Sequence, residues 1–386
     1  MVCTLGHGRG GHFYDVRVTA EALMQVASCA ICEIGFARSP VLQQSTAPVH
    51  FVDLSQGFFR AWRELREVVR RSRPTVLHAF DLRAYAFARV ASVVGRIPIV
   101  LTKCGGPNPS GWFPAASSLI VYSAENRDYF QSKWQASRHR VYLIPNRASR
   151  VRTSREREEE LRRAALLSPA RATFVRISRF VEPYRESIVQ SIALVDRLNR
   201  DGLPAQLVVI GVPEDGAVFR SVAEHQGDHV RLITDERFTV NASELLGVAD
   251  VVVGTGRGVM EAASLGIPVL VPGGGRRYPI PLTPENFESL FRDNFSPRCS
   301  DPSLGDEAAY RIVRGWLTDR RRMEEASRFV RSVYERHFDI AAALPAIMQV
   351  YEAAQVESLR RPGDLLRSVA SAARTVLGGR RARVAA

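Results

Sequence analysis

The segment Asp250–Val271, DVVVGTGRGVMEAASLGIPVLV, is the most informative stretch of the chain. An apolar run, Asp250–Val253, leads into a turn with glycine at positions 254, 256 and 258, and an amphipathic stretch then runs to a second apolar run. A strand, a glycine turn and a helix in this order place backbone N–H groups and a positive helix end around an anion. The segment therefore predicts a βαβ unit whose turn holds a diphosphate. The alternative is a glycine-rich turn that binds nothing.

Apolar runs of the same kind recur on both sides of this segment. They are rich in Val, Ile and Leu and do not alternate with polar residues, as expected for strands buried on both faces of a parallel sheet. Amphipathic stretches such as Arg83–Val94 and Glu186–Arg200 separate them and predict helices. The predicted fold class is therefore α/β with right-handed crossovers. The other predicted strands are Val76–Ala79, Ile97–Thr102, Ser118–Tyr122, Val141–Ile144, Thr173–Ile177, Gln206–Ile210, Val230–Ile233 and Pro268–Val271.

The length of 386 residues exceeds what one hydrophobic core usually supports and suits two domains. The charged run Arg155–Arg163 separates the two sets of strands and is interpreted as a solvated linker helix, so the domain boundary is placed there. After Pro272 the sequence predicts helices only. The predicted parts are an N-terminal α/β domain over 1–150, a second α/β domain over 151–338, a helix over 339–363 that returns to the first domain, and a basic amphipathic tail over 364–386.

The composition narrows the class of protein. The formal net charge of +13 suits anionic partners such as phosphate-bearing molecules or a membrane surface, and no nucleic-acid recognition motif is present. No apolar run reaches the roughly 18 residues of a membrane span, and the first residues lack a signal-peptide pattern. Five cysteines are few and odd in number, which favours a reducing compartment. Neither Asp-x-Asp nor a P-loop motif occurs. We therefore expect a cytoplasmic protein with no metal, no cofactor and no nucleic-acid partner.

The segment Gly254–Pro272 resembles the nucleotide-sugar site of the family 4 glycosyltransferases. The family pattern Glu-Gly-Phe-Gly, then Glu-Ala-Met-Ala-x-Gly-x-Pro-Val, stands here as Val253-Gly254-Thr255-Gly256, then Glu261-Ala262-Ala263-Ser264-Leu265-Gly266-Ile267-Pro268-Val269. Val253 therefore replaces the first of the family's paired glutamates, which usually contacts the donor sugar, and Glu261 keeps the second. The resemblance implies the glycosyltransferase B fold, in which two Rossmann-like domains face each other across a cleft.

Weaker blocks follow the family's order. Pro74–Ala79 resembles the family's Pro-Asp-Val-Val-His-Ala strand. Arg176–Phe180 resembles the Gly-Arg-Leu segment whose arginine, together with a lysine five residues later, grips the diphosphate. Arg179 matches that arginine. Tyr184 occupies the lysine position, and Arg185 is interpreted as the replacement, shifted by one residue.

The resemblance and the glycine turn together predict a donor site. The diphosphate would lie against the turn and the two arginines, while the Glu261 carboxylate would accept hydrogen bonds from the ribose hydroxyls. The N-terminal glycine loop corresponds to a family loop that borders the donor diphosphate. The predicted donor-binding residues are Gly10, Gly11, Arg179, Arg185, Gly256, Arg257, Gly258 and Glu261.

The candidate catalytic residues are His7, His12 and Lys103. The two histidines lie in the N-terminal glycine loop, and Lys103 lies at the end of a predicted strand, where α/β sheets bind ligands. Lys103 is also one of only two lysines in the chain, so composition does not explain it. A surface histidine and a solvated loop lysine are the alternatives. Cys104 stands where many family members have a histidine near the donor sugar, and His78 is either a cleft residue or a satisfied core residue.

The tail begins with Pro362-Gly363, which breaks the preceding helix, and Asp364, which caps a new one. An apolar stripe flanked by arginines suits an interfacial helix on an anionic leaflet. The alternatives are a helix packed on the N-terminal domain and a frayed tail. The stripe comprises Leu366, Val369, Ala370, Ala373, Val376 and Leu377, and the arginines are Arg367, Arg374, Arg380, Arg381 and Arg383.

The sequence thus predicts a metal-independent glycosyltransferase, with retention of anomeric configuration implied by the resemblance. The expected donor is a nucleotide-diphosphate sugar, and the expected acceptor is lipid-linked or a polysaccharide precursor, reached from the cytoplasm by peripheral association with the inner face of the membrane. A nucleotide-sugar 2-epimerase of the same fold is one alternative. A non-catalytic sugar-nucleotide-binding partner subunit is the other.

Overall fold

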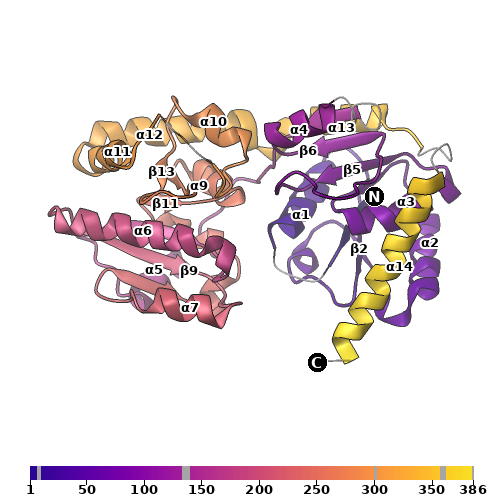
Figure 1. Cartoon of the computed structure of the whole chain (residues 1–386), viewed down its shortest axis with the longest axis horizontal. Helices are drawn as coiled ribbons and strands as arrows, with labels where there is room; N and C mark the ends of the chain where they lie inside the picture. Colours follow the sequence, from indigo (N-terminus) through magenta and orange to yellow (C-terminus); the bar gives the residue numbers. More distant parts are fainter. Residues whose placement is uncertain (7–9, 133–139, 300, 302, 357–361, 385–386) are drawn as a thin grey trace. The chain divides into compact units, whose positions relative to one another are not determined.

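The computed structural model describes residues 1–6, 10–132, 140–299, 301, 303–356 and 362–384. The chain divides into two compact units. Unit 1 consists of Met1–Arg147 together with Ile340–Ala386, and unit 2 consists of Ala148–Asp339. Each unit is built around its own sheet (Figure 1). The predicted α/β class is therefore confirmed.

Unit 1 has a seven-stranded sheet with the order β3-β2-β1-β4-β5-β6-β7, and all of its neighbouring strands are parallel. The first three strands were not among the predicted ones. They are short, and β1 and β2 interrupt their aliphatic residues with Cys, Thr and Glu. The strands are β1 Val2–Leu5, β2 Ile31–Gly35, β3 Val49–Asp53, β4 Leu77–Ala79, β5 Ile99–Lys103, β6 Ser118–Val121 and β7 Arg140–Leu143.

Two layers of helices cover this sheet. α1 (Gly11–Leu23) and α13 (Ile340–Ala353) share one apolar core, in which Val16 and Ile347 are buried. α2 (Phe58–Ser72) and α3 (Leu82–Gly95) contribute to the other core, and α14 (Pro362–Val384) lies alongside α3 (Figure 1). The remaining helical segments of unit 1 are η1 Leu42–Gln44, η2 Leu54–Gln56 and α4 Ala124–Gln131.

The contact of α14 with α3 uses a different side from the predicted apolar stripe. Ser368 and Ala372, one turn apart, are buried, and Ala372 joins the core beneath α2 and α3. Leu366 keeps 69% of its surface exposed, and Arg367 and Arg374 are exposed as well. The described part of the tail is therefore a packed helix that still presents Leu366 and two arginines to solvent.

Unit 2 has a six-stranded sheet with the order β10-β9-β8-β11-β12-β13. Five strands are parallel, and β13 runs antiparallel to β12. The expectation of helices alone after Pro272 is therefore wrong, because the short strand β13 adds to the sheet edge, a position that tolerates its proline. The strands are β8 Ala172–Ile177, β9 Ala205–Ile210, β10 Val230–Ile233, β11 Val251–Val253, β12 Val269–Val271 and β13 Ile280–Pro281.

The helices of unit 2 surround this sheet. The charged helix α5 (Arg155–Ala164) is part of the unit rather than a free linker, because Leu161 is buried and Arg157 forms an ion pair with Glu244 at 2.6 Å. The other helices are α6 Glu182–Arg200, α7 Gly216–Ala223, α8 Glu236–Thr239, η3 Ala242–Val248, α9 Arg257–Leu265, α10 Phe287–Arg292, α11 Asp306–Thr318, α12 Arg320–Val333 and the π-helical turn η4 Tyr334–Phe338.

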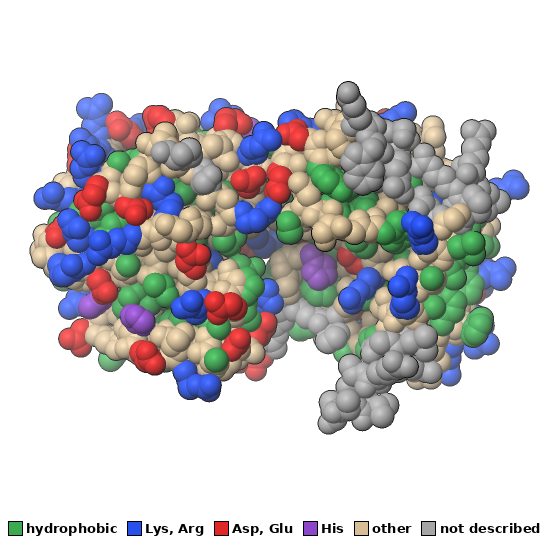
Figure 2. Space-filling model, in the orientation of Figure 1, with side chains coloured by type: hydrophobic (Ala, Val, Ile, Leu, Met, Phe, Trp, Pro, Cys, Tyr) green, Lys and Arg blue, Asp and Glu red, His purple; other side chains and the backbone are tan. Residues whose placement is uncertain are grey.

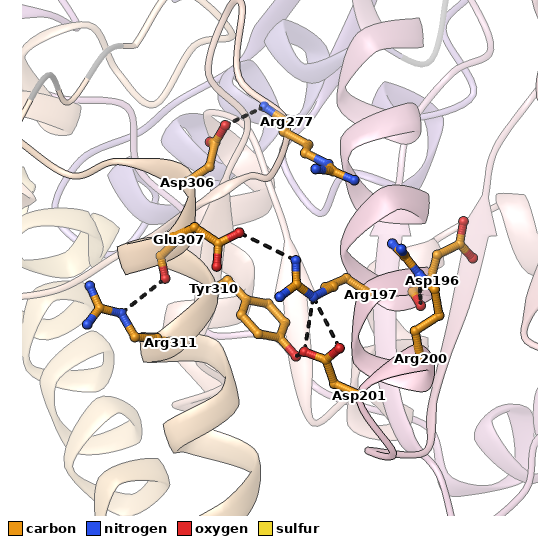
Figure 3. A network of polar contacts seen from close by, with 9 residues as sticks. All are labelled: Asp196, Arg197, Arg200, Asp201, Arg277, Asp306, Glu307, Tyr310 and Arg311. Carbon is orange, nitrogen blue, oxygen red and sulfur yellow. Dashed lines mark hydrogen bonds and ion pairs between the residues drawn. The ribbon is translucent and has the colours of Figure 1, made fainter.

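A polar network joins α6 to α11 within unit 2 (Figure 3). The Asp201 carboxylate accepts hydrogen bonds from Arg197 Nε at 3.0 Å and from the Tyr310 hydroxyl at 2.6 Å, and Arg197 also pairs with Glu307. Desolvation and the hydrogen bond to Asp201 raise the pKa of Tyr310 to about 12, so its hydroxyl remains a donor at neutral pH. The network fixes the far end of α6, the helix that follows β8.

The surface charges of unit 2 are mixed in sign. On the face drawn in Figure 2, basic and acidic side chains are interspersed. The helical pairs Arg320–Glu324 and Arg321–Glu325 are two of the ion pairs of unit 2. A search of the described residues for a helix long and apolar enough to cross a membrane found none.

Candidate functional site

The strand order of unit 2 reverses between β8 and β11. The chain leaves β8 toward β9 on one side and leaves β11 toward β12 on the other, so the two connecting loops diverge. In open α/β sheets, such a switch point forms a crevice outside the carboxyl ends of the strands, where ligands bind. Arg179 follows β8, and the turn that starts at Gly254 follows β11. The topology thus brings two separate predicted segments to one place.

The turn between β11 and α9 depends on its glycines. Gly256 has φ of +47° and ψ of −113°, a conformation that L side chains rarely adopt. A Cβ on Gly254 would lie 2.9 Å from the backbone of Gly258 and Val259, so only glycine allows the strand to pass this close to α9. The amino end of α9 therefore opens directly at the switch point, where the positive end of the helix dipole favours an anion.

Arg257 and Glu261 lie one turn apart on α9 and form an ion pair. Arg257 Nε donates to Glu261 Oε1 at 2.7 Å, and the two side chains are 18% and 13% exposed. Within the described residues, the other oxygen of Glu261 has no hydrogen-bond partner. Arg257, predicted to bind the diphosphate, thus fixes the carboxylate that was predicted to bind ribose, and an acceptor oxygen is left for hydroxyl groups.

The two arginines predicted to grip the diphosphate are more exposed. Arg179 is half-exposed, pairs with Glu214 at 3.1 Å and lies with its guanidinium 5.6 Å from the Tyr184 ring centre. Arg185 pairs with Glu182 at 3.2 Å on the first turns of α6. Both pairs are surface ion pairs of small energy, so either guanidinium can exchange its carboxylate for a phosphate at little cost.

A second glycine loop, also at the carboxyl ends of the strands of unit 2, was not predicted from the sequence. The loop Gly273–Gly275 follows β12, and two side chains of α6 bind it. Gln190 Nε2 donates to the Gly273 carbonyl at 2.6 Å, and the Gly275 N–H donates to Glu186 Oε1 at 2.8 Å. Three glycines directly after a buried strand are the signal that could have identified it. The loop adds backbone groups beside the turn after β11.

Unit 1 has a switch point of its own, between β1 and β4. Gly10 is the N-cap of α1 and Gly11 its first residue, so both lie at this point, while His7 lies outside the described residues. His12 faces Asp81, whose carboxylate is held by the N–H groups of Leu5 and Ala84. Burial lowers the pKa of His12, and the nearby charge of the Asp81 carboxylate opposes this shift.

Comparison with known proteins shows the fold. No protein-family model matches the chain, and no curated protein matches it by sequence. Among solved structures, HepE of Anabaena, described in complex with UDP and glucose, superposes with a TM-score of 0.65 at 15% identity, covering 91% of this chain and 99% of its own. A glycosyltransferase of Rickettsia africae gives 0.65 at 11% identity, covering 91% of this chain and 97% of its own. The chain has the glycosyltransferase B fold.

This fold is shared by another class of sugar-nucleotide enzyme. The UDP-GlcNAc 2-epimerase of Neisseria meningitidis, bound to UDP-GlcNAc, superposes with a TM-score of 0.53 at 12% identity, covering 92% of this chain and all of its own. Structures described with UDP and with UDP-GlcNAc bound therefore share this fold. Transfer and epimerisation share the architecture, so the fold does not separate the two reactions.

In the glycosyltransferase B fold of this chain, Lys103 ends β5 and organises a loop. Its Nζ donates to the carbonyl oxygens of Gly105 and Gly106 at 2.6 and 3.2 Å and to Asn126 Oδ1 at 3.0 Å. An ammonium group has three N–H donors, and these contacts use all of them. The geometry thus favours a positioning role for Lys103, and its predicted catalytic role stays a prediction.

The described residues contain no group of three His, Cys, Asp or Glu side chains that could hold a metal ion.

His78, the middle residue of β4, is a buried core residue of unit 1. Its Nδ1 lies 2.8 Å from the Tyr351 hydroxyl and its Nε2 lies 2.6 Å from Thr102 Oγ1, so both ring nitrogens are satisfied. Burial, together with the nearby N-terminal amine, lowers the pKa of His78 to about 3. The ring also borders a small cavity whose polar lining includes Asp15, Thr19 and Asn146.

The neutral state of His78 predicts an acid-sensitive stability. An unfolded histidine titrates near pH 6.5, so below this pH the unfolded chain binds a proton that the folded chain rejects until about pH 3. His78 therefore contributes full stability above pH 6.5 and loses it as the pH falls toward 3. When the pH falls from 7 to 5, the unfolding free energy of the His78→Gln variant should therefore drop by about 2 kcal/mol less than that of the wild type.

Urea unfolding at the two pH values measures this difference. His225→Gln is the control, because His225 is exposed on unit 2. An identical pH dependence in the wild type and in His78→Gln would show that His78 does not titrate as its buried position requires.

Proposed function

We propose that this protein is a glycosyltransferase that moves a sugar from a nucleotide-diphosphate sugar to a lipid-linked or polysaccharide-precursor acceptor. The observation that carries the proposal is the convergence, at the switch point of unit 2, of Arg179, the glycine turn and the ion-paired Glu261. This arrangement combines a cation and backbone donors for a diphosphate with a carboxylate for ribose. The likeness to structures that hold UDP and UDP-GlcNAc supports a nucleotide-sugar ligand.

Each group has a defined task in the proposed reaction. The turn Gly256–Gly258 at the positive end of α9 and the guanidinium groups of Arg179 and Arg185 stabilise the charge that develops on the leaving diphosphate. Glu261 fixes the ribose while Arg257 holds the carboxylate in place. The residues expected to serve the acceptor are His7, His12 and Lys103 of unit 1. The family resemblance adds retention of configuration and independence of metal to the proposal.

A thermal-denaturation screen tests the donor site. A ligand that binds only the folded state raises the melting temperature, so UDP, GDP, ADP and TDP are compared at equal concentrations. One of these diphosphates should raise the melting temperature of the wild type. No shift with any of the four would contradict the proposal.

The Arg179→Ala variant should lower turnover by tenfold or more, because a tenfold loss corresponds to about 1.4 kcal/mol of transition-state stabilisation. Arg185→Ala should have an effect of the same size. The measurement is steady-state transfer of sugar from the diphosphate donor that the screen identifies. Arg237→Ala is the matched control, because Arg237 is also an exposed, ion-paired arginine of unit 2. Full activity in Arg179→Ala would rule out the proposed donor site, whereas full activity in Arg185→Ala alone would remove only Arg185 from it.

The 2-epimerase is the second candidate, and the Neisseria structure is the observation in its favour. The two reactions differ in what they need, since an epimerase converts the sugar nucleotide without an acceptor. Incubation of the purified protein with donor alone, followed by chromatography of the sugar nucleotide, separates them. Binding without any conversion or transfer would instead support a non-catalytic subunit.

We also propose that the chain works from the cytoplasm at the inner face of the membrane, where a lipid-linked acceptor resides. α14 supports this, because Leu366 is exposed beside Arg367 and the helix carries five arginines against one aspartate. Such a helix can lie on an anionic leaflet while its other side packs on α3.

Neutralising the tail should weaken membrane attachment. Each arginine near an anionic surface contributes about 1 kcal/mol, so the double variant Arg367→Gln/Arg374→Gln should lose roughly 30-fold in affinity for anionic vesicles. Co-sedimentation with liposomes measures this loss, and high salt should reduce the binding of the wild type. The double variant Arg320→Gln/Arg321→Gln changes the net charge equally on unit 2. Equal losses in both variants would mean that the tail is not the anchor.

A further inference from the structure

Arg176 is a buried arginine directly beneath the switch point of unit 2. It is 2% exposed and occupies the second-last position of β8. In the sheet it pairs with Val253, the last residue of β11. β8 and β11 are the two strands between which the strand order reverses. The side chain thus starts from the floor of the crevice in which the donor diphosphate is proposed to bind.

The partners of this guanidinium are all neutral. Nη1 donates to the Val253 carbonyl at 3.3 Å, and Nη2 donates to Ser187 Oγ of α6 at 3.1 Å. Nε is buried without an acceptor in the described part of the chain, and no carboxylate there forms an ion pair with Arg176. The Tyr184 ring lies with its centre 6.0 Å from the guanidinium carbon. Burial lowers the pKa of Arg176 to about 10, so the group still carries its charge at neutral pH.

A buried cation without a counter-ion is costly. Removing an ionised group from water carries a penalty of several kcal/mol, which only a nearby opposite charge offsets. Arg257, by contrast, has Glu261 within 2.7 Å. Arg176 is thus a positive charge without a counter-ion in a low-dielectric environment, so a bound anion would stabilise it.

We infer that Arg176 is a positioning residue that makes the switch point selective for the phosphate groups of the nucleotide. It holds the Val253 carbonyl, from which the Gly254 turn starts, and it supplies a fixed positive charge below the crevice. Charge in such a buried place is screened less than charge at the surface. This inference rests on the proposed function, since it assigns the phosphate preference of the same site to a residue in its floor.

The test compares two ligands that share base and ribose and differ in phosphate. Calorimetry gives the dissociation constants of uridine and UDP, and their ratio is the phosphate preference. If the nucleotide screen selects another base, its nucleoside and nucleoside diphosphate replace them. Arg176→Met should reduce the ratio by roughly tenfold, the size of one charge interaction through a partly polar interior, while uridine affinity stays within about twofold. Arg176→Lys should restore most of the ratio.

Arg89→Met is the matched control. Arg89 is also a fully buried arginine, 1% exposed on α3 of unit 1, and its loss should leave the ratio unchanged. A wild-type ratio in folded Arg176→Met would overturn the inference. If the wild type binds no nucleoside diphosphate at all, it is the proposed function that fails.

Two further measurements test the role of Arg176 if the Arg176→Met variant does not fold. Arg176→Gln keeps an amide donor for the Val253 carbonyl without the charge, and it should lower the ratio as the methionine does. The wild type itself should keep most of its phosphate preference in 0.5 M salt, because salt screens the exposed Arg179 and Arg185 more strongly than a buried cation. A preference that disappears in salt would assign it to the exposed arginines and overturn the role of Arg176.

Discussion

The Gly211→Ala variant is expected to lose about 3 kcal/mol of unfolding free energy, the upper end of the usual cost of overpacking. Gly211 follows β9 and lies against Ser178, which follows β8. A Cβ at Gly211 would overlap the Ser178 carbonyl oxygen, and that oxygen belongs to the backbone, so no side-chain rotation relieves the clash. The strand ends are also tied together, because Ser178 N–H donates to the Ile210 carbonyl at 2.9 Å. The substitution must therefore push two central strands apart.

Urea unfolding measures the loss in Gly211→Ala. Gly227→Ala is the matched control, because Gly227 is an exposed glycine of unit 2, and a Cβ added there would have no atom within 4 Å. Its unfolding free energy should change by less than about 0.5 kcal/mol. Since Ser178 precedes Arg179, Gly211→Ala should also weaken UDP binding. A Gly211→Ala protein as stable as the wild type would mean that the Ser178 carbonyl does not lie against Gly211.

The Glu261→Ala variant should lower nucleotide affinity by about 30-fold. Losing a charged hydrogen-bond partner usually costs about 2 kcal/mol, which corresponds to that factor. Glu261 is 13% exposed at the switch point, and within the described residues one of its oxygens has no partner. The substitution also releases Arg257, which is held at 2.7 Å. Calorimetric titration with the nucleoside diphosphate selected by the screen gives the affinity directly.

Glu244→Ala is the matched control for Glu261→Ala. Glu244 also pairs with an arginine, Arg157, at 2.6 Å in unit 2, but it lies on η3 rather than at the switch point. Both variants lose an ion pair, so both should lose some stability, and only Glu261→Ala should lose affinity. Unchanged affinity in Glu261→Ala would exclude a role in ribose binding. An equal loss in both would show that affinity merely follows stability.

The sequence predicts the parallel sheet of unit 2 well because its central strands are nearly continuous apolar runs. β9, for example, is AQLVVI and is buried throughout. The edge strand β13 has two residues, one of them proline, and no pattern of period two can form in so short a segment. Residues 2–5 and 31–35 form buried strands that contain Cys, Thr and Glu, so hydropathy alone does not mark them.

The chemical partners of the site residues depend on contacts that sequence spacing does not encode. Lys103 carries its charge at a strand end, as predicted, yet its donors are used by carbonyl groups of its own loop and by Asn126. Arg176 was included in a predicted strand because its neighbours are apolar, and its buried charge becomes evident only once β11 and α6 surround it. The pairing of Arg257 with Glu261 is different, since residues four apart share a helix face and their spacing is visible in the sequence.

The division of the chain has a consequence for the order in which the protein is synthesised. Unit 2 is inserted into unit 1, and its two ends meet where Ala148 N–H donates to the Phe338 carbonyl at 2.9 Å. The core around α1 needs Ile340, Leu344 and Ile347 of α13, which a ribosome adds only after all of unit 2. Unit 2 can therefore complete its core first. Until α13 is synthesised, the face of the unit 1 sheet that α13 covers stays exposed to solvent. During translation this uncovered face, rather than unit 2, is the surface on which a chaperone would act.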